Sequence, residues 1–355
     1  MRLPGFILAE LSVAATLLAG ATYGVSRGVG AARSVLAVRD AELRLPPVAL
    51  GTRRDLSTLP DLRVALEASG TFLGMSDEVL LQRVRTQPIV RFKVNHGGSS
   101  LSFRVEFADG SRAAWKPLQT NRQTIPRKEV AAYRINRLLG LNAVPPAAER
   151  AITRAEILSH LHPESLPEVP RIEAETLFGA GDKVLGTASY WIPVIKDSGF
   201  DTPEGQQLEQ TWLSVGQQIP GNMRAMAAQL SDLVVFDFLT ANPDRLSGGN
   251  MKMSPDGHQL FFMDNTMSFF VEPEGNKKSR DALMRTQRFS RAMVEALNRI
   301  DVPTLERALA EETGTPYEIL TPAEIGAVVA RRDVVRQYVA VLVDHFGPRE
   351  VLAFP

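Results

Sequence analysis

The sequence contains no cysteine, and this absence removes three classes of chemistry together. Disulfide bonds, thiolate metal sites and cysteine nucleophiles are all excluded. An excess of charge of either sign is also missing, because 40 basic residues balance 40 acidic residues. A chain with zero formal net charge has no global electrostatic attraction for nucleic acid or for an anionic membrane. We therefore expect no nucleic-acid partner.

What the sequence does contain is typical of a folded globular protein. Its 355 residues are 44% hydrophobic and 23% charged, with no internal repeat and no low-complexity block. This length fits one large two-lobed domain or two smaller ones.

The N-terminus is the one segment with the character of a targeting signal. Gly5 to Val25 is mainly apolar and would extend about 31 Å as a helix, enough to span a bilayer. Arg2 before it and the small residues Ala19-Gly20-Ala21 also suit a signal peptide. We predict a signal peptide or membrane anchor over 1–28, with membrane anchoring through 5–25, and an exported protein. The alternative is an alanine-rich amphipathic helix packed on the domain.

A β-rich segment follows a proline- and arginine-rich stretch, 29–87, which we assign to a linker or N-terminal arm. Ser76 in this arm is a plausible N-cap for the segment SDEVLLQRV. The stretches IVRFKV, LSFRVEF and SRAAWKP alternate apolar and polar residues, with Asp109-Gly110 between the last two. This pattern predicts a small antiparallel sheet with a hairpin. We place it in an N-terminal lobe over 88–193.

Helical spacing of apolar residues predicts a helix in IPRKEVAAYRINRLLGL, ending at Gly140. Residues 149–180 give no clear pattern, and KVLGTASYWIPVI indicates a further strand. From about Gln206 the chain is mainly helical, and ALMRTQRFSRAMVEAL is predicted to form one helix. The fold class is therefore α+β, with a helical lobe over 194–355 and a cleft expected between the lobes.

Three features of the β-rich segment suggest phosphate chemistry, although each has a plainer explanation. Gly97 and Gly98, followed by Ser99, would let backbone N–H groups approach a phosphate, or could simply turn a hairpin. Lys116 leaves an apolar strand and needs a partner, unless it reaches solvent. Glu129 lies in the first turn of the following helix, where the helix dipole favours an acid in any case. A lysine of a strand paired with a glutamate of a helix is also how kinases hold nucleotide phosphates.

Two acids in the helical half complete the pattern. Asp244 follows the apolar run VVFDFL in a polar loop that could be an ordinary turn, and Asp264 follows the apolar residues LFFM. Phosphoryl transfer needs one acid to orient the acceptor hydroxyl and another to hold a divalent ion. Asn250 could supply a neutral second metal ligand. The order of these elements along the chain is stronger support than any one of them.

The segments AAWKPLQTNRQ, KEVAAYRINRLLGLNAVPP, DLVVFDFLTANPDR and FFMDN together resemble the atypical kinases of the secretory pathway. That family includes the Golgi casein kinase, the xylosyl kinase of proteoglycan synthesis and the Four-jointed kinase. The resemblance extends from about residue 88 to 300. More distantly the segments are similar to the HipA kinases and the phosphatidylinositol kinases.

The resemblance implies a two-lobed kinase-like fold and a role for each matching residue. Lys116 would contact the phosphates of ATP and Glu129 would pair with it, while Asn242 would shape the loop within the nucleotide site. Asp244 would be the catalytic base. Asp264 would bind Mg²⁺ or Mn²⁺. The base of the nucleotide would lie near the hinge, around 190–193, and the acceptor would be a protein or a glycan.

The sequence departs from the family at two points near the catalytic residues. Leu246 follows Arg245, where members often have histidine, and Asn250 lies six residues after Asp244 instead of about five. Both departures suit the alternative function, a membrane-anchored pseudokinase that binds a nucleotide or a partner protein as a scaffold. Because Lys116, Asp244 and Asp264 are all present, the sequence favours an active phosphotransferase. The oligomeric state is not indicated.

Overall fold

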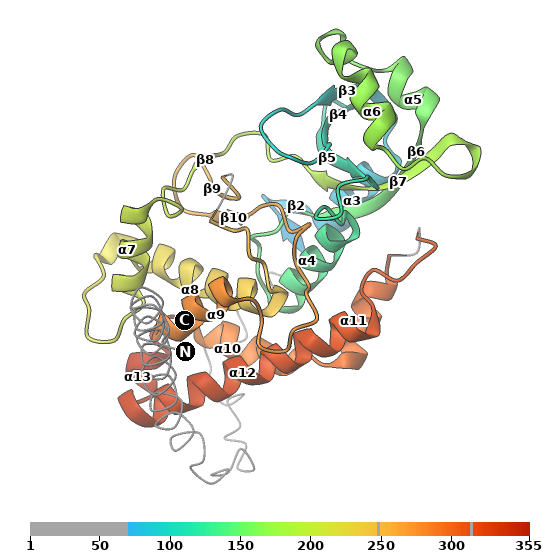
Figure 1. Ribbon diagram of the computed structural model, residues 1–355. Helices are drawn as coiled ribbons and strands as arrows, with labels where there is room; N and C mark the ends of the chain where they lie inside the picture. Colours follow the sequence, from blue (N-terminus) through green and yellow to red (C-terminus); the bar gives the residue numbers. More distant parts are fainter. Residues whose placement is uncertain (1–69, 247–248, 313–314) are drawn as a thin grey trace, which may run out of the picture. The chain divides into compact units, whose positions relative to one another are not determined.

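A five-stranded antiparallel sheet forms where apolar and polar residues alternate in the sequence (Figure 1). The computed structural model describes residues 70–246, 249–312 and 315–355. The strands lie in the order β3-β4-β5-β7-β6, and they are β3 (Ile89–Val94), β4 (Phe103–Phe107), β5 (Arg112–Pro117), β6 (Ala147–Thr153) and β7 (Lys183–Tyr190). The sheet predicted from the first three strands is confirmed, and β7 is the further strand that the sequence indicated.

Alternation along the strands gives the sheet two different faces. Phe103 and Val105 of β4 and Trp115 of β5 are buried, and the rings of Phe103 and Trp115 lie 5.5 Å apart. Successive side chains of a strand point to opposite faces, so Lys116 points away from this aromatic core. Gly110 closes the predicted hairpin with a positive φ of 81°, a conformation that glycine adopts without strain.

A short helix and a strand pair precede the sheet and pack on it. They are β1 (Thr71–Phe72), β2 (Met75–Ser76) and α3 (Asp77–Thr86). The Ser76 side chain accepts a hydrogen bond from the N–H of Val79, so the predicted N-cap is confirmed. Phe72 is fully buried, with its ring 6.3 Å from that of Tyr190 on β7.

The N-terminal predictions are only partly covered by the structure. The stretch 70–87, which is the end of the predicted linker or N-terminal arm, forms α3 and the β1–β2 pair and is part of the folded unit. The remainder of that segment and the predicted signal or anchor over 1–28 lie outside the described residues. In the part of the chain that is described, no helix combines the length and the apolar character needed to cross a membrane.

Helix α4 (Arg127–Leu138) follows β5 and carries Glu129. It ends at Leu138, two residues before Gly140, where the sequence placed the end, and Gly140 has a φ of 75°. The segment that the sequence left unassigned forms α5 (Arg154–Ser159), the 3₁₀ helix η3 (Pro163–Glu168) and α6 (Val169–Glu175), with a short 3₁₀ turn η4 (Ala180–Asp182) before β7.

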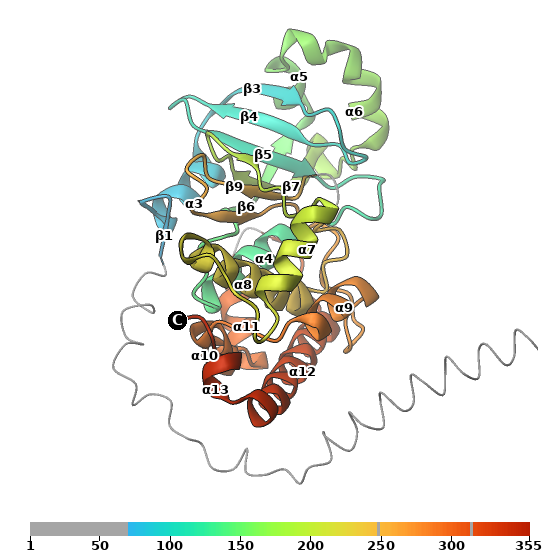
Figure 2. The same ribbon diagram turned by 90° about the vertical axis from the view of Figure 1, so that its left-hand side faces the viewer.

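The remainder of the chain is mainly helical and lies on one side of the five-stranded sheet (Figure 2). Its helices are α7 (Pro203–Trp212), η5 (Gly221–Met223), α8 (Arg224–Thr240), α9 (Lys277–Arg285), α10 (Arg291–Ala296), η6 (Leu297–Arg299), α11 (Val302–Ala310), α12 (Pro322–Phe346) and α13 (Pro348–Val351). A small sheet in the order β10-β9-β8 joins β8 (Lys196–Asp197), β9 (Met251–Met253) and β10 (Leu260–Phe262).

One helix predicted from the sequence is wrong in the structure. The segment 282–297 does not form one helix, because the chain leaves α9 at Thr286 and enters α10 only after Ser290. The Ser290 side chain caps α10 by accepting a hydrogen bond from the N–H of Met293. Between the two helices, the N–H groups of Gln287 and Arg288 both donate to the carbonyl of Leu213. Tertiary hydrogen bonds thus replace a helical turn that the apolar spacing alone would allow.

Arg331 of α12 is fully buried and holds three backbone carbonyl groups. Its guanidinium donates to the carbonyl oxygens of Leu239, Phe270 and Glu272, each at 2.8 Å. Leu239 is close to the end of α8, whereas the other two residues follow β10. Burial lowers the pKa of Arg331 to about 10, so the group remains charged at neutral pH. One side chain of α12 therefore fixes two segments that lead to the site described below.

We predict that Arg331→Ala lowers the free energy of unfolding by about 3 kcal/mol, because three buried carbonyl groups lose a charged donor. Urea denaturation followed by circular dichroism measures the change. The matched control is Arg336→Ala on the same helix, whose side chain is 38% exposed, and which should change the value by no more than about 0.5 kcal/mol. Equal effects of the two substitutions would contradict this role of Arg331.

Candidate active site

Three charged side chains from different elements meet beside the five-stranded sheet. The ammonium nitrogen Nζ of Lys116 on β5 lies 2.6 Å from Oδ1 of Asp264 and 3.5 Å from Oε1 of Glu129 on α4. Asp264 directly follows the Met263 that leaves β10, and its Oδ1 also accepts a hydrogen bond from the Thr266 hydroxyl at 2.7 Å. Three of the residues predicted for the site are therefore in direct contact.

The opposite charges of these side chains stabilise the ionised forms of Lys116 and Asp264. Burial alone would lower the pKa of Lys116, but the carboxylates of Asp264 and Glu129 raise it, so the ammonium form is retained. Burial raises the pKa of Glu129 although Lys116 opposes the shift. For Asp264 the attraction of Lys116 outweighs burial and lowers the pKa of the carboxyl group. The site thus holds an ionised acid next to a buried cation.

A cleft of about 210 Å³ adjoins these charges. Its wall on the sheet includes Ala114 and Lys116 of β5 and the side chains of Thr187 and Ser189, which lie opposite them on β7. The chain that leaves β7 also lines the cleft, through Tyr190, Trp191 and Ile192. The segment in which the sequence suggested a nucleotide base therefore borders the cleft.

The glycine-containing loop between β3 and β4 lies at the edge of this cleft. Asn95 and Ser102, at the two ends of the loop, line the cleft, whereas Gly97, Gly98 and Ser99 are exposed. Gly97 has a φ of 107°, and no atom lies within 4 Å of the position that a Cβ would take at either glycine. The backbone of this turn is accessible, as an approach by a phosphate would require.

The loop after α8 brings the remaining predicted residues together. Helix α8 ends at Ala241 in the left-handed conformation, with a φ of 51°. The Asn242 side chain then accepts a hydrogen bond from the N–H of Asp244 at 2.9 Å, which forms an Asx turn. The side-chain amide of Asn250 donates to Oδ2 of Asp244 at 3.3 Å. The backbone carbonyl of Asn250 accepts a hydrogen bond from the N–H of Met263 at 2.9 Å. Asn250 therefore lies between the loop and the strand that leads to Asp264.

Asn242 has an internal role in this arrangement. Its amide nitrogen donates to the carbonyl of Asp264 and to Oδ1 of Asn265, both at 3.4 Å. The side chain thus ties the loop to the residues after β10 and does not line the cleft beside Lys116. The role of Asn242 in the nucleotide site stays a prediction.

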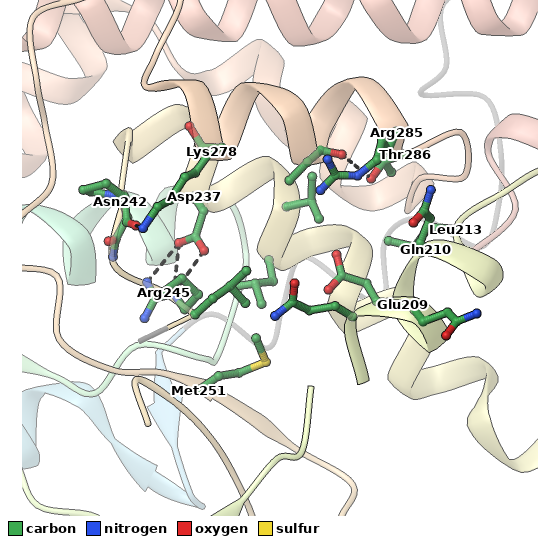
Figure 3. Close-up of a pocket in the computed structure, with 18 of the residues that line it drawn as sticks. Glu209, Gln210, Leu213, Asp237, Asn242, Arg245, Met251, Lys278, Arg285 and Thr286 are labelled. Atoms are coloured by element: carbon green, nitrogen blue, oxygen red, sulfur yellow. Dashed lines mark hydrogen bonds and ion pairs between the residues drawn. The ribbon is translucent and has the colours of Figure 1, made fainter. Parts of the chain in front are cut away.

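Sequence reasoning missed the buried pair that holds the loop, Asp237 and Arg245 (Figure 3). The guanidinium of Arg245 contacts both carboxylate oxygens of Asp237, at 2.9–3.1 Å. It also donates to Oδ1 of Asn265 at 2.7 Å, and Asn265 in turn donates to Oε2 of Glu129 at 3.2 Å. The sequence does hold a signal for this pair, since an acid inside an apolar helix needs a partner.

Comparisons with known proteins give a family match over the middle of the chain. The family model described as "Four-jointed box protein middle domain" matches residues 76–272. Four-jointed box protein 1 of Xiphophorus maculatus is 27% identical over 187 residues, which are 52% of this chain and 40% of that protein. The chain thus spans less than half the length of this relative.

Solved structures share the fold at low sequence identity. The Golgi casein kinase with Mn and ADP bound superposes with a TM-score of 0.60 at 16% identity, over 78% of each chain. The structure of hydra Fam20 with sugar gives a TM-score of 0.60 at 18% identity, over 81% of this chain and 97% of that chain. The predicted two-lobed, kinase-like α+β fold and the resemblance to secretory-pathway kinases are confirmed.

We predict that Asp237→Ala lowers the free energy of unfolding by about 3–5 kcal/mol, because the Arg245 guanidinium stays buried without its carboxylate. Urea denaturation measures the loss. The double substitution Asp237→Ala with Arg245→Met removes both charges and should recover part of the loss.

As a control, Asp197→Ala removes an acid whose side chain is 81% exposed beside Lys252, and it should leave the unfolding curve unchanged. If the double variant is no more stable than Asp237→Ala, burial of the unpaired charge is not the cause of the loss.

Proposed function

This chain belongs to the family of the Four-jointed box protein middle domain, and on that premise we propose that it is an ATP-dependent phosphotransferase. It would move the γ-phosphoryl group of ATP to a hydroxyl group of a protein serine or threonine, or of a sugar. The observation that carries the proposal is the contact of Lys116 with both Glu129 and Asp264 at the edge of the 210 Å³ cleft. A buried lysine between two acids is suited to exchange one of them for phosphate oxygens.

In this proposal the cleft holds the nucleotide. Residues 190–192 border the base, and Lys116 contacts the phosphates while Glu129 keeps its ammonium group in place. The open turn at Gly97, Gly98 and Ser99 covers the phosphates with backbone N–H groups. Other phosphoryl-transfer enzymes also place a glycine-rich loop and a lysine against the nucleotide phosphates.

Asp264 and Asn250 would hold the divalent ion, Mg²⁺ or Mn²⁺. In the described ranges, no cluster of three or more His, Asp or Glu side chains could enclose a metal ion by itself. The residues nevertheless fit, because such ions bind through one or two carboxylates together with phosphate oxygens. The position beside Asp264 already attracts the Lys116 ammonium, and the low pKa of Asp264 keeps its carboxylate ionised. When bound, the ion neutralises charge on the phosphates.

Asp244 would be the catalytic base. It accepts the proton of the acceptor hydroxyl as that oxygen bonds to the γ-phosphorus and the bond to ADP breaks. The Asx turn from Asn242 and the hydrogen bond from Asn250 orient its carboxylate before the acceptor arrives. Pre-orientation of a base increases the rate because the entropy cost of bringing the reacting groups into the right geometry is met before the reaction.

The second candidate is a nucleotide-binding scaffold without transfer activity. The departures from the family pattern at Leu246 and Asn250 favour it. For either function we propose export of the protein, with residues 5–25 as its signal or membrane anchor.

We predict that Asp264→Ala in the full chain abolishes metal-dependent nucleotide binding. ATP with Mn²⁺ should raise the thermal midpoint of the wild-type protein, and the substitution should remove this shift because the metal loses its carboxylate. The control Asp333→Ala changes an acid on α12 whose side chain is 47% exposed, and it should keep the full shift. A shift retained by Asp264→Ala would exclude this residue as the metal ligand.

We predict that Asp244→Asn keeps nucleotide binding and lowers phosphate transfer by about 10²–10⁴-fold, since the amide cannot accept the proton. Transfer of label from ATP to separate protein and glycan acceptors measures this rate. If the wild-type protein binds ATP with Mn²⁺ but labels no acceptor, itself included, the scaffold is the correct function.

A further inference from the structure

A second cavity, of about 480 Å³, lies between α7, α8 and α9, and the mechanism above gives it no role (Figure 3). It shares no lining residue with the cleft beside Lys116. Part of its wall is the loop that follows α8, through Asn242, Pro243, Arg245 and Leu246.

The position of the cavity relates it to the acceptor. Asn242 and Pro243 precede Asp244 directly, and Arg245 and Leu246 follow it. A molecule seated in the cavity therefore contacts the chain on both sides of the proposed base. Since the acceptor hydroxyl has to reach Asp244, the group bound here would belong to the part of the acceptor next to that hydroxyl.

The floor of the cavity is apolar. Leu213 at the end of α7, Leu233 and Val234 of α8, and Met251 of β9 line it and are almost fully buried. Burying an apolar side chain against such a floor is favourable because apolar surface is removed from water. A sugar hydroxyl in the same place would lose its hydrogen bonds to water, which costs free energy unless they are replaced. The floor favours an aliphatic group over a sugar ring.

The rim of the cavity is rich in groups that can pair with a peptide backbone. Helix α7 contributes the amides of Gln206, Gln207 and Gln210, each able to donate and to accept hydrogen bonds. Burial raises the pKa of Glu209 to about 7, although Arg285 opposes the shift. Near neutral pH its carboxyl group can therefore serve as donor or acceptor. The α9 side of the cavity carries the charged residues Lys278 and Arg285. An apolar floor with amides along its α7 side matches a side chain and its adjoining peptide units.

From this geometry we infer that the cavity between α7, α8 and α9 is an acceptor subsite that takes an aliphatic side chain of a polypeptide, next to the hydroxyl residue to be phosphorylated. The inference rests on the proposed function and adds to it the class of acceptor and the residues that select it.

The test uses the full chain, labelled ATP with Mn²⁺, and a series of serine peptides. In each peptide a single leucine occupies one of the three positions on either side of the serine, and matched peptides carry aspartate there. Wild-type protein should prefer leucine over aspartate by about 10-fold or more in kcat/KM at one position at least, the range expected for burying one apolar side chain.

Ala282→Phe on α9 fills the cavity from its wall and should abolish the preference by raising KM for the leucine peptide, with KM for ATP unchanged. Gln210→Trp on the exposed face of α7 blocks the rim of the cavity without altering the core. This variant replaces Ala282→Phe in the test if Ala282→Phe fails to fold. The matched control is Ala308→Phe on α11, which is equally half-buried but lies outside the cavity. It should retain the preference.

The inference is overturned if the wild-type protein shows no preference among the peptides, or if Ala282→Phe and Gln210→Trp both retain the preference. Transfer to glycan acceptors alone, impaired by the same substitutions, would assign the cavity to a sugar. Absence of transfer to any acceptor is a distinct outcome, because it refutes the proposed function and the subsite with it.

Discussion

The buried ion pair between Asp237 and Arg245 is the interaction on which the arrangement of the site depends. Asp237 lies in α8, a helix buried over most of its length, and Arg245 comes from the loop that follows it. A charge buried alone at either position would be costly, so the loop is held close to the helix that it has just left. The other donors of Arg245 bind Asn265 and the carbonyl of Asn250. One guanidinium thereby fixes both ends of the loop that contains Asp244.

Lys116 connects the sheet to the helices in a comparable way, because its ammonium group contacts Glu129 of α4 and Asp264 after β10. Asn265 donates to Glu129 as well as accepting from Arg245, so the two networks are continuous. On the proposed function, phosphate oxygens that draw Lys116 away from Asp264 would release a carboxylate for the divalent ion. Binding of the nucleotide and of the metal would then favour each other, since each removes a partner that the other has to displace.

Much of this could be predicted from local sequence patterns, where neighbouring residues carry the information. Alternation in 89–117 predicted three strands, and the spacing of apolar residues predicted α4 with its end at Gly140. The same patterns failed where distant groups decide the structure. The helix ends at Thr286 because the N–H groups of Gln287 and Arg288 donate to the carbonyl of Leu213, and no local signal in the sequence marks these hydrogen bonds. The predicted roles of Lys116 and Asp264 depended on resemblance as much as on residue type, whereas the partner of Asp237 could be found only once the loop was seen to fold back.

The loop around Asp244 also separates two spaces that share no lining residue. The cleft contains Lys116 and Asp264, whereas the cavity has an aliphatic floor with amide and charged side chains around it. The described residues Asn242, Arg245 and Asn250 of this loop all bind to the segment that carries Asp264. A substitution on α7 or α9 can therefore alter what is bound in the cavity while the groups that face the cleft keep their positions. Selection of an acceptor and the chemistry of transfer can then change independently within one fold.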